Sequence, residues 1–577
     1  MTLLYRVLFN KYTVLLLILF AGFAIRYQYI DKSNFNFVSG GDQIIYLHIA
    51  DGMSRDHEFR MEPGLRSFMP PMHPWILTGL SYLFGQDLKV FYLFYFLLSS
   101  LTALLLFFIA KTLVNEFTGI AAALIFLCYE DIIYWTTTMY TETPFLFFYV
   151  FLLLCLFLYS KRNNILFLAA GAVFFTASFY SRSTVLLLLP FIPVHIYLNS
   201  ALGSKKRLFH AGLFILIVGA LMAPWTIRNY GIHKTIVLGS TNGGMNFYQG
   251  NNPEATGGMM WPSTFRQENY WQRPELTETG QDAYYYTEGK KWIRSNPGKF
   301  LRLELKKLQA LLYPAITPES YPGKVSEDRP AFLINWHDLV KLGILGFILG
   351  FRRFKEWIIL YSAAFVTIFS AMVYYGAQRY RFMLDISMII FAAYFICQTV
   401  EYLSLKLLKK EINLSNFRLY DPTLKAIGAA ILFLALVAAA VLFTGAKRLM
   451  FLHGLDSTAG VTFDARALKH GPAKFENDSL YMCWPSFVDK KLDLPAGEYR
   501  LSFTAYGSPD KTQYPKMVFL LNKQNISETA VNDRKVTYSV DFRHGGNIAD
   551  IYIWNNGPPG TSAHLFNINI KRLRINP

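Results

Sequence analysis

Charged residues and cysteines are both scarce in this chain, and each shortage excludes a class of protein. Asp, Glu, Lys and Arg make up 16% of the 577 residues and 53% are hydrophobic, which excludes an ordinary soluble domain. Of the four cysteines, Cys128, Cys155 and Cys397 fall in apolar runs, and Cys483 stands alone in the polar part. We therefore expect neither an intradomain disulfide nor a structural zinc site.

Long apolar runs are abundant instead. A membrane-spanning helix needs about 20 predominantly apolar residues. Such runs predict about eleven spans, near 12–30, 88–110, 117–129, 141–159, 165–180, 183–198, 209–225, 336–350, 357–375, 382–403 and 424–444. The tract 70–84 is too short to span and predicts an interfacial helix. The chain is therefore expected to be a polytopic α-helical membrane protein.

Lys and Arg in the short loops predict the orientation, because cytoplasmic loops carry an excess of both. The segments expected in the cytoplasm hold 16 basic residues and four acids, and they are 1–11, 111–118, 160–164, 199–210, 351–356 and 404–425. They place the N-terminus inside, and an odd span count places the C-terminus outside. The formal charge of +17 is then mainly a topology signal, so no nucleic-acid partner is expected. The first run lacks a small-residue cleavage site and is expected to be retained.

Three long segments fall on the outer side. Two of them, 31–87 and 226–335, are loops of a transmembrane domain expected over 1–445. The third, 446–577, contains short runs of alternating apolar and polar residues separated by Gly, Pro, Asn and Asp. This pattern predicts an extracytoplasmic β-sandwich domain, jelly-roll-like, whose role is either glycan binding or spacing.

Acids and arginines gather at the outer ends of the predicted spans. They are Asp42, Glu130, Asp131, Glu142, Arg182, Arg228, Arg379 and Arg381. Charge is costly near a bilayer, so their shared side indicates a functional site, although any single one also suits helix capping or snorkelling. Acids suit deprotonation of a hydroxyl and Arg suits a phosphate, which together indicate a lipid-linked substrate. At most one of Glu130 and Asp131 is expected to point inward.

Asp42 is the strongest candidate among these residues. It opens the segment GGDQIIYLHIADGM, in which helical spacing places Asp42, Tyr46, Ile49 and Met53 on one face. A carboxylate on an apolar face favours a catalytic base over a solvated charge. The candidates for contacts to the sugar or acceptor are Tyr46, Asn242, Tyr248 and Tyr380, whereas His48 and His73 are expected to pack at the interface.

The order of several motifs resembles a known family. The chain is similar to bacterial members of the dolichyl-phosphate-mannose protein mannosyltransferase family and its lipid A aminoarabinose transferase relatives, of the glycosyltransferase C superfamily. The similarity covers about residues 1–400 and rests on GGDQIIYLHIADGM, PPMHPWIL, TETPF, SRSTVLLLLP, RNYG, STNGGMNFYQGNNPEATGG and QRYRFMLDISMIIF. It implies about 11 transmembrane helices and inverting transfer of a sugar from a polyprenyl monophosphate to a hydroxyl of protein, lipid A or another glycan.

The resemblance also implies roles for particular residues. Asp42 matches the presumed base and Glu142 matches a second acid. Arg379 and Arg228 fall near motifs expected to contact the donor phosphate. Further phosphate-binding candidates are Arg381, Arg182 and Arg66.

Two departures from the family pattern affect this region. Pro70 stands where some relatives carry a Lys, so either Arg66 replaces that Lys at the phosphate or the donor binds in a different position. Gln43 follows Asp42 where an Asp-Glu pair is common, so Glu142 is the expected partner of Asp42.

A leaving monophosphate can be neutralised by Arg, so no metal or other obligatory cofactor is expected beside the polyprenyl-phosphate sugar. The expected location is a bacterial inner membrane, with the N-terminus cytoplasmic and the C-terminal domain periplasmic. Two other functions remain open, a transporter or flippase of lipid-linked sugars and a non-catalytic glycan-assembly protein. A transporter would be expected to carry internal repeats and mid-membrane polar residues.

Overall fold

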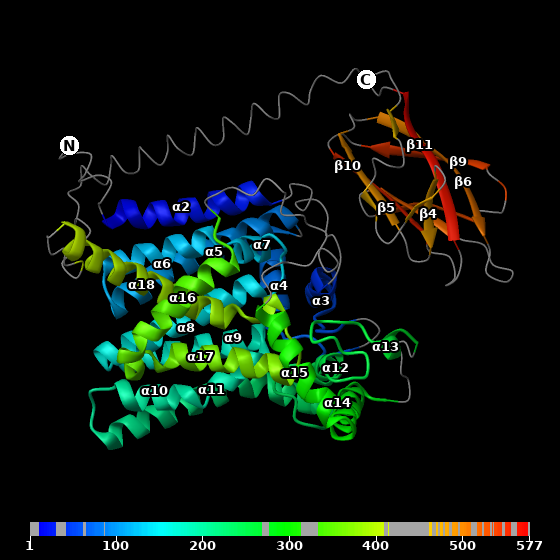
Figure 1. The fold of residues 1–577 in the computed structure, drawn as a ribbon. Coiled ribbons are helices and arrows are strands. Elements are labelled where there is room, and N and C mark those ends of the chain that lie inside the picture. Colours follow the sequence, from blue (N-terminus) through cyan, green and yellow to red (C-terminus); the bar gives the residue numbers. More distant parts are fainter. Residues whose placement is uncertain are drawn as a thin grey trace. The chain divides into compact units, whose positions relative to one another are not determined.

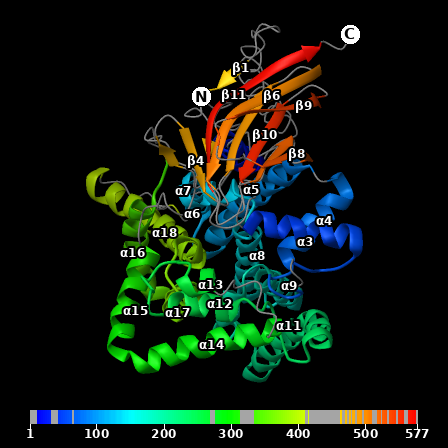
Figure 2. The same ribbon diagram turned by 90° about the vertical axis from the view of Figure 1, so that its right-hand side faces the viewer.

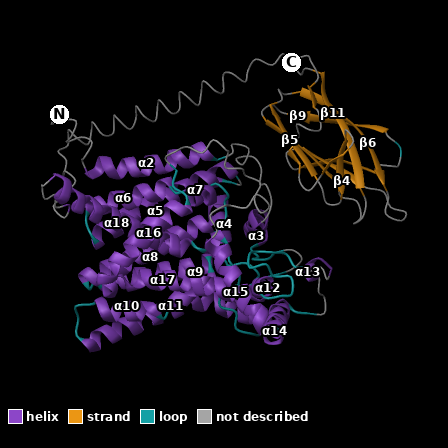
Figure 3. Cartoon of the chain, in the orientation of Figure 1, coloured by secondary structure: helices purple, strands orange, loops and turns teal. Residues whose placement is uncertain are grey.

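Helices occupy the first part of the chain and strands the last (Figure 3). The computed structural model describes residues 11–30, 42–61, 65–85, 87–267, 276–312, 333–408, Leu414, Arg534 and the strands between 461 and 574. The chain divides into two compact units, Met1–Ala435 and Leu436–Pro577.

The first unit is helical (Figure 1). Its α-helices are α2 (Lys11–Tyr29), α3 (Asp42–Asp56), α4 (Met72–Phe84), α5 (Leu88–Leu113), α6 (Glu116–Cys128), α7 (Glu130–Thr136), α8 (Glu142–Arg162), α9 (Ile165–Ser181), α10 (Phe191–Asn199), α11 (Ser204–His233), α12 (Gly243–Gly250), α13 (Ser263–Gln267), α14 (Glu278–Ser295), α15 (Pro297–Leu312), α16 (Trp336–Gly350), α17 (Phe354–Val373) and α18 (Phe382–Leu408). Three short 3₁₀ turns, Ser183–Leu188, Phe351–Arg353 and Gln378–Tyr380, connect some of them.

Six stretches of the described chain are long and apolar enough to cross a membrane, by length and composition. They are Tyr12–Tyr29, Leu88–Leu113, Glu142–Arg162, Ser204–His233, Trp336–Val373 and Phe382–Ser404. Helices α6 and α9 are apolar but shorter. The expected run 424–444 lies outside the described residues, so the figure of eleven spans stays a prediction.

The predicted span 183–198 is not one continuous helix. The 3₁₀ turn Ser183–Leu188 is followed by α10, and Pro190 directly precedes α10. Proline has no N–H to donate and its ring clashes with the preceding turn, so an α-helix cannot run through this position without distortion. A hydrophobic run of the right length is therefore not sufficient to specify a straight helix.

Close helix packing builds the bundle. A Cβ on Gly346 of α16 would overlap the backbone carbonyl of Phe391 in α18, so this contact requires glycine. Arg26 of α2 is fully buried and donates to the carbonyl oxygen of Leu127 at 2.9 Å and to Ser99 Oγ at 3.1 Å. An arginine inside the bundle thus ties α2 to α5 and α6.

The loops 31–87 and 226–335 supply the helices at one end of this bundle. Figures 1 and 2 both place α3, α4, α12, α13 and α14 there. The two loops are joined directly, because the backbone N–H groups of Arg66 and Ser67 donate to the Glu278 carboxylate at 2.7 and 2.9 Å. The two loops that the sequence assigns to one side therefore do lie at one end of the helices.

The second unit contains two antiparallel sheets. One has the strand order β3-β4-β11-β6-β9 with β1 beside β11, and the other has the order β2-β5-β10-β7-β8. The strands are β1 (Val461–Phe463), β2 (Lys469–His470), β3 (Lys474–Glu476), β4 (Ser479–Cys483), β5 (Phe487–Asp493), β6 (Gly497–Ser508), β7 (Lys516–Leu521), β8 (Gln524–Ala530), β9 (Val536–His544), β10 (Ile548–Asn555) and β11 (Ser562–Arg574). Phe503 of β6 and Phe519 of β7 have ring centroids 4.7 Å apart, so the sheets touch through apolar residues.

Candidate active site

Asp42 lies at the wall of a cavity at the α3 end of the bundle. It is the first residue of α3, and Tyr46 and Ile49 on the same helical face are buried. His73 of α4 packs edge-on against the Tyr46 ring, with centroids 4.4 Å apart. The Asp42 side chain keeps 35% of its surface exposed, so the cavity can reach a carboxylate that is anchored by its apolar neighbours.

His73 is buried behind Tyr46. Its Nδ1 lies 2.6 Å from the Tyr95 hydroxyl, and the side chain has no exposed surface. Burial lowers the pKa of His73 to about 3, so the imidazole is neutral at ordinary pH. It serves as packing behind Tyr46.

Two arginines connect two carboxylates beside the cavity. Arg379 donates from Nε to Glu142 Oε1 at 2.8 Å and from both terminal nitrogens to Asp42 Oδ2 at 3.2 Å. Arg182, the residue that ends α9, donates to the same Glu142 oxygen at 2.7 Å. Four of the charged residues singled out from the sequence are thus in one hydrogen-bonded cluster, although Asp42 and Arg379 are 337 positions apart.

Aromatic rings hold the two guanidinium groups in place. Arg379 lies over the rings of Trp135 and Tyr140, at 5.4 and 5.2 Å from their centroids. Arg182 lies over the Tyr380 ring at 4.8 Å. Such contacts favour the charged form of Arg, so the cluster presents two preoriented cations next to the cavity.

Glu142 does not reach the cavity, as a residue that exchanges a proton with a substrate would. Its side chain is completely buried and is absent from the cavity wall, whereas its neighbour Thr141 contributes to that wall. Its carboxylate accepts from both arginines. The sequence suggested a second catalytic acid, but this geometry favours an anchor that positions Arg182 and Arg379.

Glu142→Gln is expected to lower the free energy of unfolding by about 3–5 kcal/mol, because it leaves two almost buried guanidinium groups without their shared counter-charge. Thermal unfolding in detergent checks this. Glu356→Gln is the matched control, since Glu356 also opens a helix and pairs with an arginine but is 48% exposed. That control should change stability by less than about 0.5 kcal/mol. Equal melting temperatures for the two variants would contradict the anchoring role.

The cavity has a volume of about 950 Å³. Its walls combine charged, amide and aromatic side chains with an apolar strip formed by Leu186, Leu187, Ile236, Leu238 and Phe369. Ligand sites typically have this size and this mixture of apolar lining with a few polar groups. The volume is sufficient for a sugar ring together with the phosphate to which it is attached.

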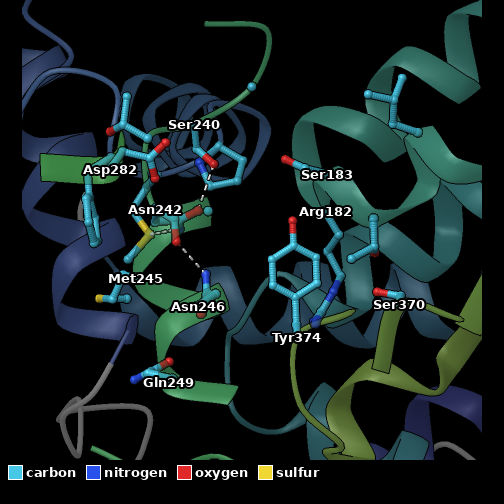
Figure 4. A pocket seen from close by; sticks show the side chains of 18 of the residues that line it. Arg182, Ser183, Ser240, Asn242, Met245, Asn246, Gln249, Asp282, Ser370 and Tyr374 are labelled. Carbon is cyan, nitrogen blue, oxygen red and sulfur yellow. Dashed lines mark hydrogen bonds between the residues drawn. The ribbon is translucent and has the colours of Figure 1, made fainter. Parts of the chain in front are cut away.

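One face of α12 lines this cavity (Figure 4). Asn242, Met245, Asn246 and Gln249 are spaced as i, i+3, i+4 and i+7, the pattern of a single helical face. Tyr248 is on another face, where its ring packs 5.4 Å from that of Tyr285. Of the sugar-binding candidates from the sequence, Tyr46, Asn242 and Tyr380 line the cavity and Tyr248 does not.

Several cavity residues were missed at the level of sequence. Asn246, Gln249, Asp282, Tyr286, Lys290, Ser183, Tyr374 and Tyr375 all line it. The helical spacing within GGMNFYQG predicts that Asn246 and Gln249 lie on the same face as Asn242, so these two residues could have been identified from the sequence. For the α14 residues no comparable signal existed, because nothing in the sequence pairs α14 with α12.

Asp282 is the second acid exposed to the cavity. Burial raises its pKa to about 6, and the N–H of Gly244, which donates to its Oδ1, offsets part of that rise. The folded state therefore binds this proton more tightly than the unfolded chain, whose aspartate has a pKa near 3.8. The proton's stabilising contribution is complete below about pH 4 and is lost as the pH rises through 6.

Asp282→Asn is expected to raise the melting temperature at pH 8, because it removes a partly buried charge and leaves an oxygen for the Gly244 N–H. The gain should shrink as the pH falls through 6. Melting curves of the two proteins between pH 5 and pH 8 check this. Glu288→Gln on the same helix is the control and should show no such trend. A stability difference independent of pH would contradict the assignment.

Arg228 and Arg66 lie away from the cavity wall. Arg228 is inside α11, which continues to His233, and it donates to the carbonyl oxygens of Phe59 at 3.0 Å and Arg66 at 2.9 Å. The Arg66 side chain is 49% exposed and its nearest acid is Glu58, at 3.9 Å. The donors of Arg228 hold a loop, and neither arginine lines the cavity. Their expected contact with the phosphate stays a prediction.

Arg381 belongs to a separate buried cluster. It donates to Asp131 and, at 3.2 Å, to the Tyr129 hydroxyl, and its Nε lies 3.2 Å from Asp385 Oδ1. Its guanidinium is 4.1 Å from the Trp336 ring centroid and has no exposed surface. Arg381 therefore forms an interior link between α7 and α18 and is absent from the cavity wall, and its expected phosphate contact stays a prediction. Asp131 is the inward-pointing member of its pair with Glu130, which is half-buried.

Among the described residues, no group of three or more His, Cys, Asp or Glu side chains is arranged to hold a metal ion. The independence from a metal or other cofactor stays a prediction.

Residues 69–227 match the sequence model of the dolichyl-phosphate-mannose-protein mannosyltransferase family. The resemblance inferred from the motifs is thereby confirmed over this segment. The segment contains Glu142 and Arg182 but neither Asp42 nor Arg379, so the tertiary contacts, and not the match, connect those two residues to it. No curated protein matches the chain.

Among solved structures, the chain is similar to the archaeal oligosaccharyltransferase AglB from Archaeoglobus fulgidus in complex with an inhibitory peptide and a dolichol-phosphate. The identity is 11%, the TM-score 0.45, and the coverage 74% of this chain and 54% of that one. For the apo form of the oligosaccharyltransferase from the same organism, the identity is 13%, the TM-score 0.42, and the coverage 74% of this chain and 54% of that one. The chain thus spans about half the length of this enzyme. A CBM36-1 domain of a xylanase from the hindgut metagenome of Trinervitermes trinervoides matches at 9% identity and TM-score 0.19, over 20% of this chain and 100% of that domain.

Proposed function

We propose that the chain is a membrane glycosyltransferase that moves a sugar from a polyprenyl-phosphate donor to an acceptor hydroxyl with inversion at the anomeric carbon. The observation that carries the proposal is the cluster of Asp42, Arg379, Glu142 and Arg182 at the edge of a cavity of about 950 Å³. A partly exposed carboxylate beside two arginines supplies what this transfer needs, a base and a phosphate site. The family match over residues 69–227 supports the same reaction class.

In the proposed reaction, Asp42 accepts the proton of the acceptor hydroxyl as that oxygen forms a bond to the anomeric carbon. The bond from this carbon to the phosphate oxygen breaks on the opposite face, and its electron pair leaves with the polyprenyl phosphate. The leaving group gains one negative charge. Arg379 and Arg182 stabilise that charge, while Glu142 keeps both guanidinium groups oriented. The proton remains on Asp42 and then passes to solvent.

We further propose a bacterial inner-membrane location, with the cavity on the periplasmic side. The excess of Lys and Arg in the opposite loops supports this orientation. The contact between Phe503 and Phe519 supports a β-sandwich for the second unit. Its role in acceptor binding or spacing is open to truncation experiments.

A direct test uses purified protein in proteoliposomes with a decaprenyl-phosphate hexose labelled in the sugar, and a cell-envelope fraction as the acceptor source. Transfer predicts label in the acceptor fraction and an equal amount of free decaprenyl phosphate. A flippase would instead move the intact labelled lipid across the bilayer without releasing decaprenyl phosphate. The absence of both outcomes would favour a non-catalytic assembly role.

A further inference from the structure

Gln249 presents a buried amide that no protein group uses. Its side chain is 1% exposed and lines the cavity. Among the described residues, neither its Nε2 nor its Oε1 has a hydrogen-bond partner. Burying an amide without partners costs free energy in the empty protein, so such a group is expected where a ligand supplies the missing hydrogen bonds.

The other amides of this segment are already engaged. Asn242 accepts from Ser240 Oγ at 2.9 Å. Asn246 donates to the Asn242 carbonyl oxygen at 2.9 Å and accepts from the Tyr375 hydroxyl at 3.2 Å. Gln249, one turn further along the same face of α12, differs from them in that both its donor and its acceptor are buried without a partner among the described residues (Figure 4).

The backbone under Gln249 is held rigidly. A Cβ on the next residue, Gly250, would overlap the carbonyl of Tyr374, so the end of α12 packs directly on the segment that follows α17. Asn251 donates to the Val373 carbonyl oxygen at 3.0 Å and accepts from Lys307 Nζ at 2.9 Å. The backbone that carries the Gln249 side chain is therefore fixed before any ligand binds, which reduces the entropy that binding must overcome.

Two hydrogen bonds and a cation–π contact connect this face of α12 to Arg182. Tyr375 donates to Asn246, and its hydroxyl lies 2.7 Å from that of Tyr380, whose ring lies under the Arg182 guanidinium. On the Arg182 side of the cavity, the Ser183 hydroxyl also has no partner among the described residues. A group bound beside Gln249 would thus lie in the same cavity as Arg182, an expected phosphate contact.

We propose that Gln249 is a specificity-determining residue that binds a hydroxyl group of the transferred sugar. This inference rests on the proposed function. A hydroxyl both donates and accepts, as the two free atoms of the amide require, whereas a phosphate or carboxylate would leave Oε1 unpaired. The sugar is the hydroxyl-bearing group attached directly to the donor phosphate, so it fits this place better than the lipid chain does.

The test compares the binding of two lipids to the full-length protein in detergent. Decaprenyl phosphate carries no sugar, and decaprenyl-phosphate glucose, mannose and galactose form the sugar-bearing panel. Gln249→Met removes both hydrogen-bonding atoms at similar volume. It should weaken binding of the preferred sugar-bearing lipid by about 10- to 100-fold and leave decaprenyl phosphate unchanged. Discrimination among the three sugars should fall as well.

Tyr248→Phe on another face of α12 is the matched control, because the Tyr248 ring packs against Tyr285 and is absent from the cavity wall, and it should leave both affinities unchanged. Gln249→Met should also melt no lower than the native protein, since it removes an unsatisfied buried amide. Unchanged affinity for every sugar-bearing lipid, or equal weakening of both lipid types, would overturn the inference. Failure of the native protein to bind either lipid would overturn the proposed function and this inference with it.

Discussion

Asp42→Asn is expected to reduce sugar transfer by about 10²- to 10⁴-fold, because an amide cannot accept the proton of the acceptor hydroxyl. Asn keeps the size of the side chain and an oxygen for Arg379, so the protein should fold and still bind the donor. The initial rate of decaprenyl-phosphate release from the labelled hexose donor measures the effect. The loss should appear in kcat and not in the affinity for the donor.

The control for this variant is Asp51→Asn, on the same helix but absent from the cavity wall. It should transfer sugar at the native rate. Full activity of Asp42→Asn would refute the assignment of the base. Lost movement of lipid across the bilayer, with intact transfer, would favour the transport alternative.

Arg379→Gln is expected to weaken binding of decaprenyl phosphate by about 10-fold or more and to lower kcat by about 10²- to 10³-fold, because the charge on the leaving phosphate loses one of its two guanidinium partners. The affinity and kcat of Arg379→Lys should lie between those of the native protein and Arg379→Gln, since Lys keeps the charge without the planar guanidinium. Equilibrium binding of decaprenyl phosphate and the transfer rate measure the two effects. A melting curve shows how much of either effect comes from destabilisation of the protein by loss of the Arg379–Glu142 ion pair.

Arg66→Gln is the control for Arg379→Gln. The sequence indicated that Arg66 binds the phosphate, whereas the structure places its side chain half-exposed beside Glu58. This variant should leave lipid binding and transfer unchanged. If Arg66→Gln weakened binding as much as Arg379→Gln, the phosphate site would have to lie on the loop 59–67 side of the molecule.

The charged residues divide into those whose clustering could be predicted from the sequence and those whose partners could not. Hydropathy locates the ends of the predicted spans, and loop charge assigns each end to one side of the membrane. This was enough to group Asp42, Glu142, Arg182 and Arg379. However, the side of the membrane on which a residue lies does not specify which other residues it contacts. Arg381 satisfies the same criterion, yet it is 250 positions away from Asp131 in sequence and pairs with that residue in the interior.

The sequence alone determined the membrane class, the clustering of the outer loops and the apolar face under Asp42, because composition, charge bias and helical periodicity are local properties of the chain. The tertiary structure decided which carboxylate reaches the cavity and which is an anchor. It also decided that Gln249 faces that cavity without a partner, while Tyr248 packs against Tyr285. These outcomes depend on contacts between helices far apart in the chain, and no local pattern encodes which partners the packing brings together.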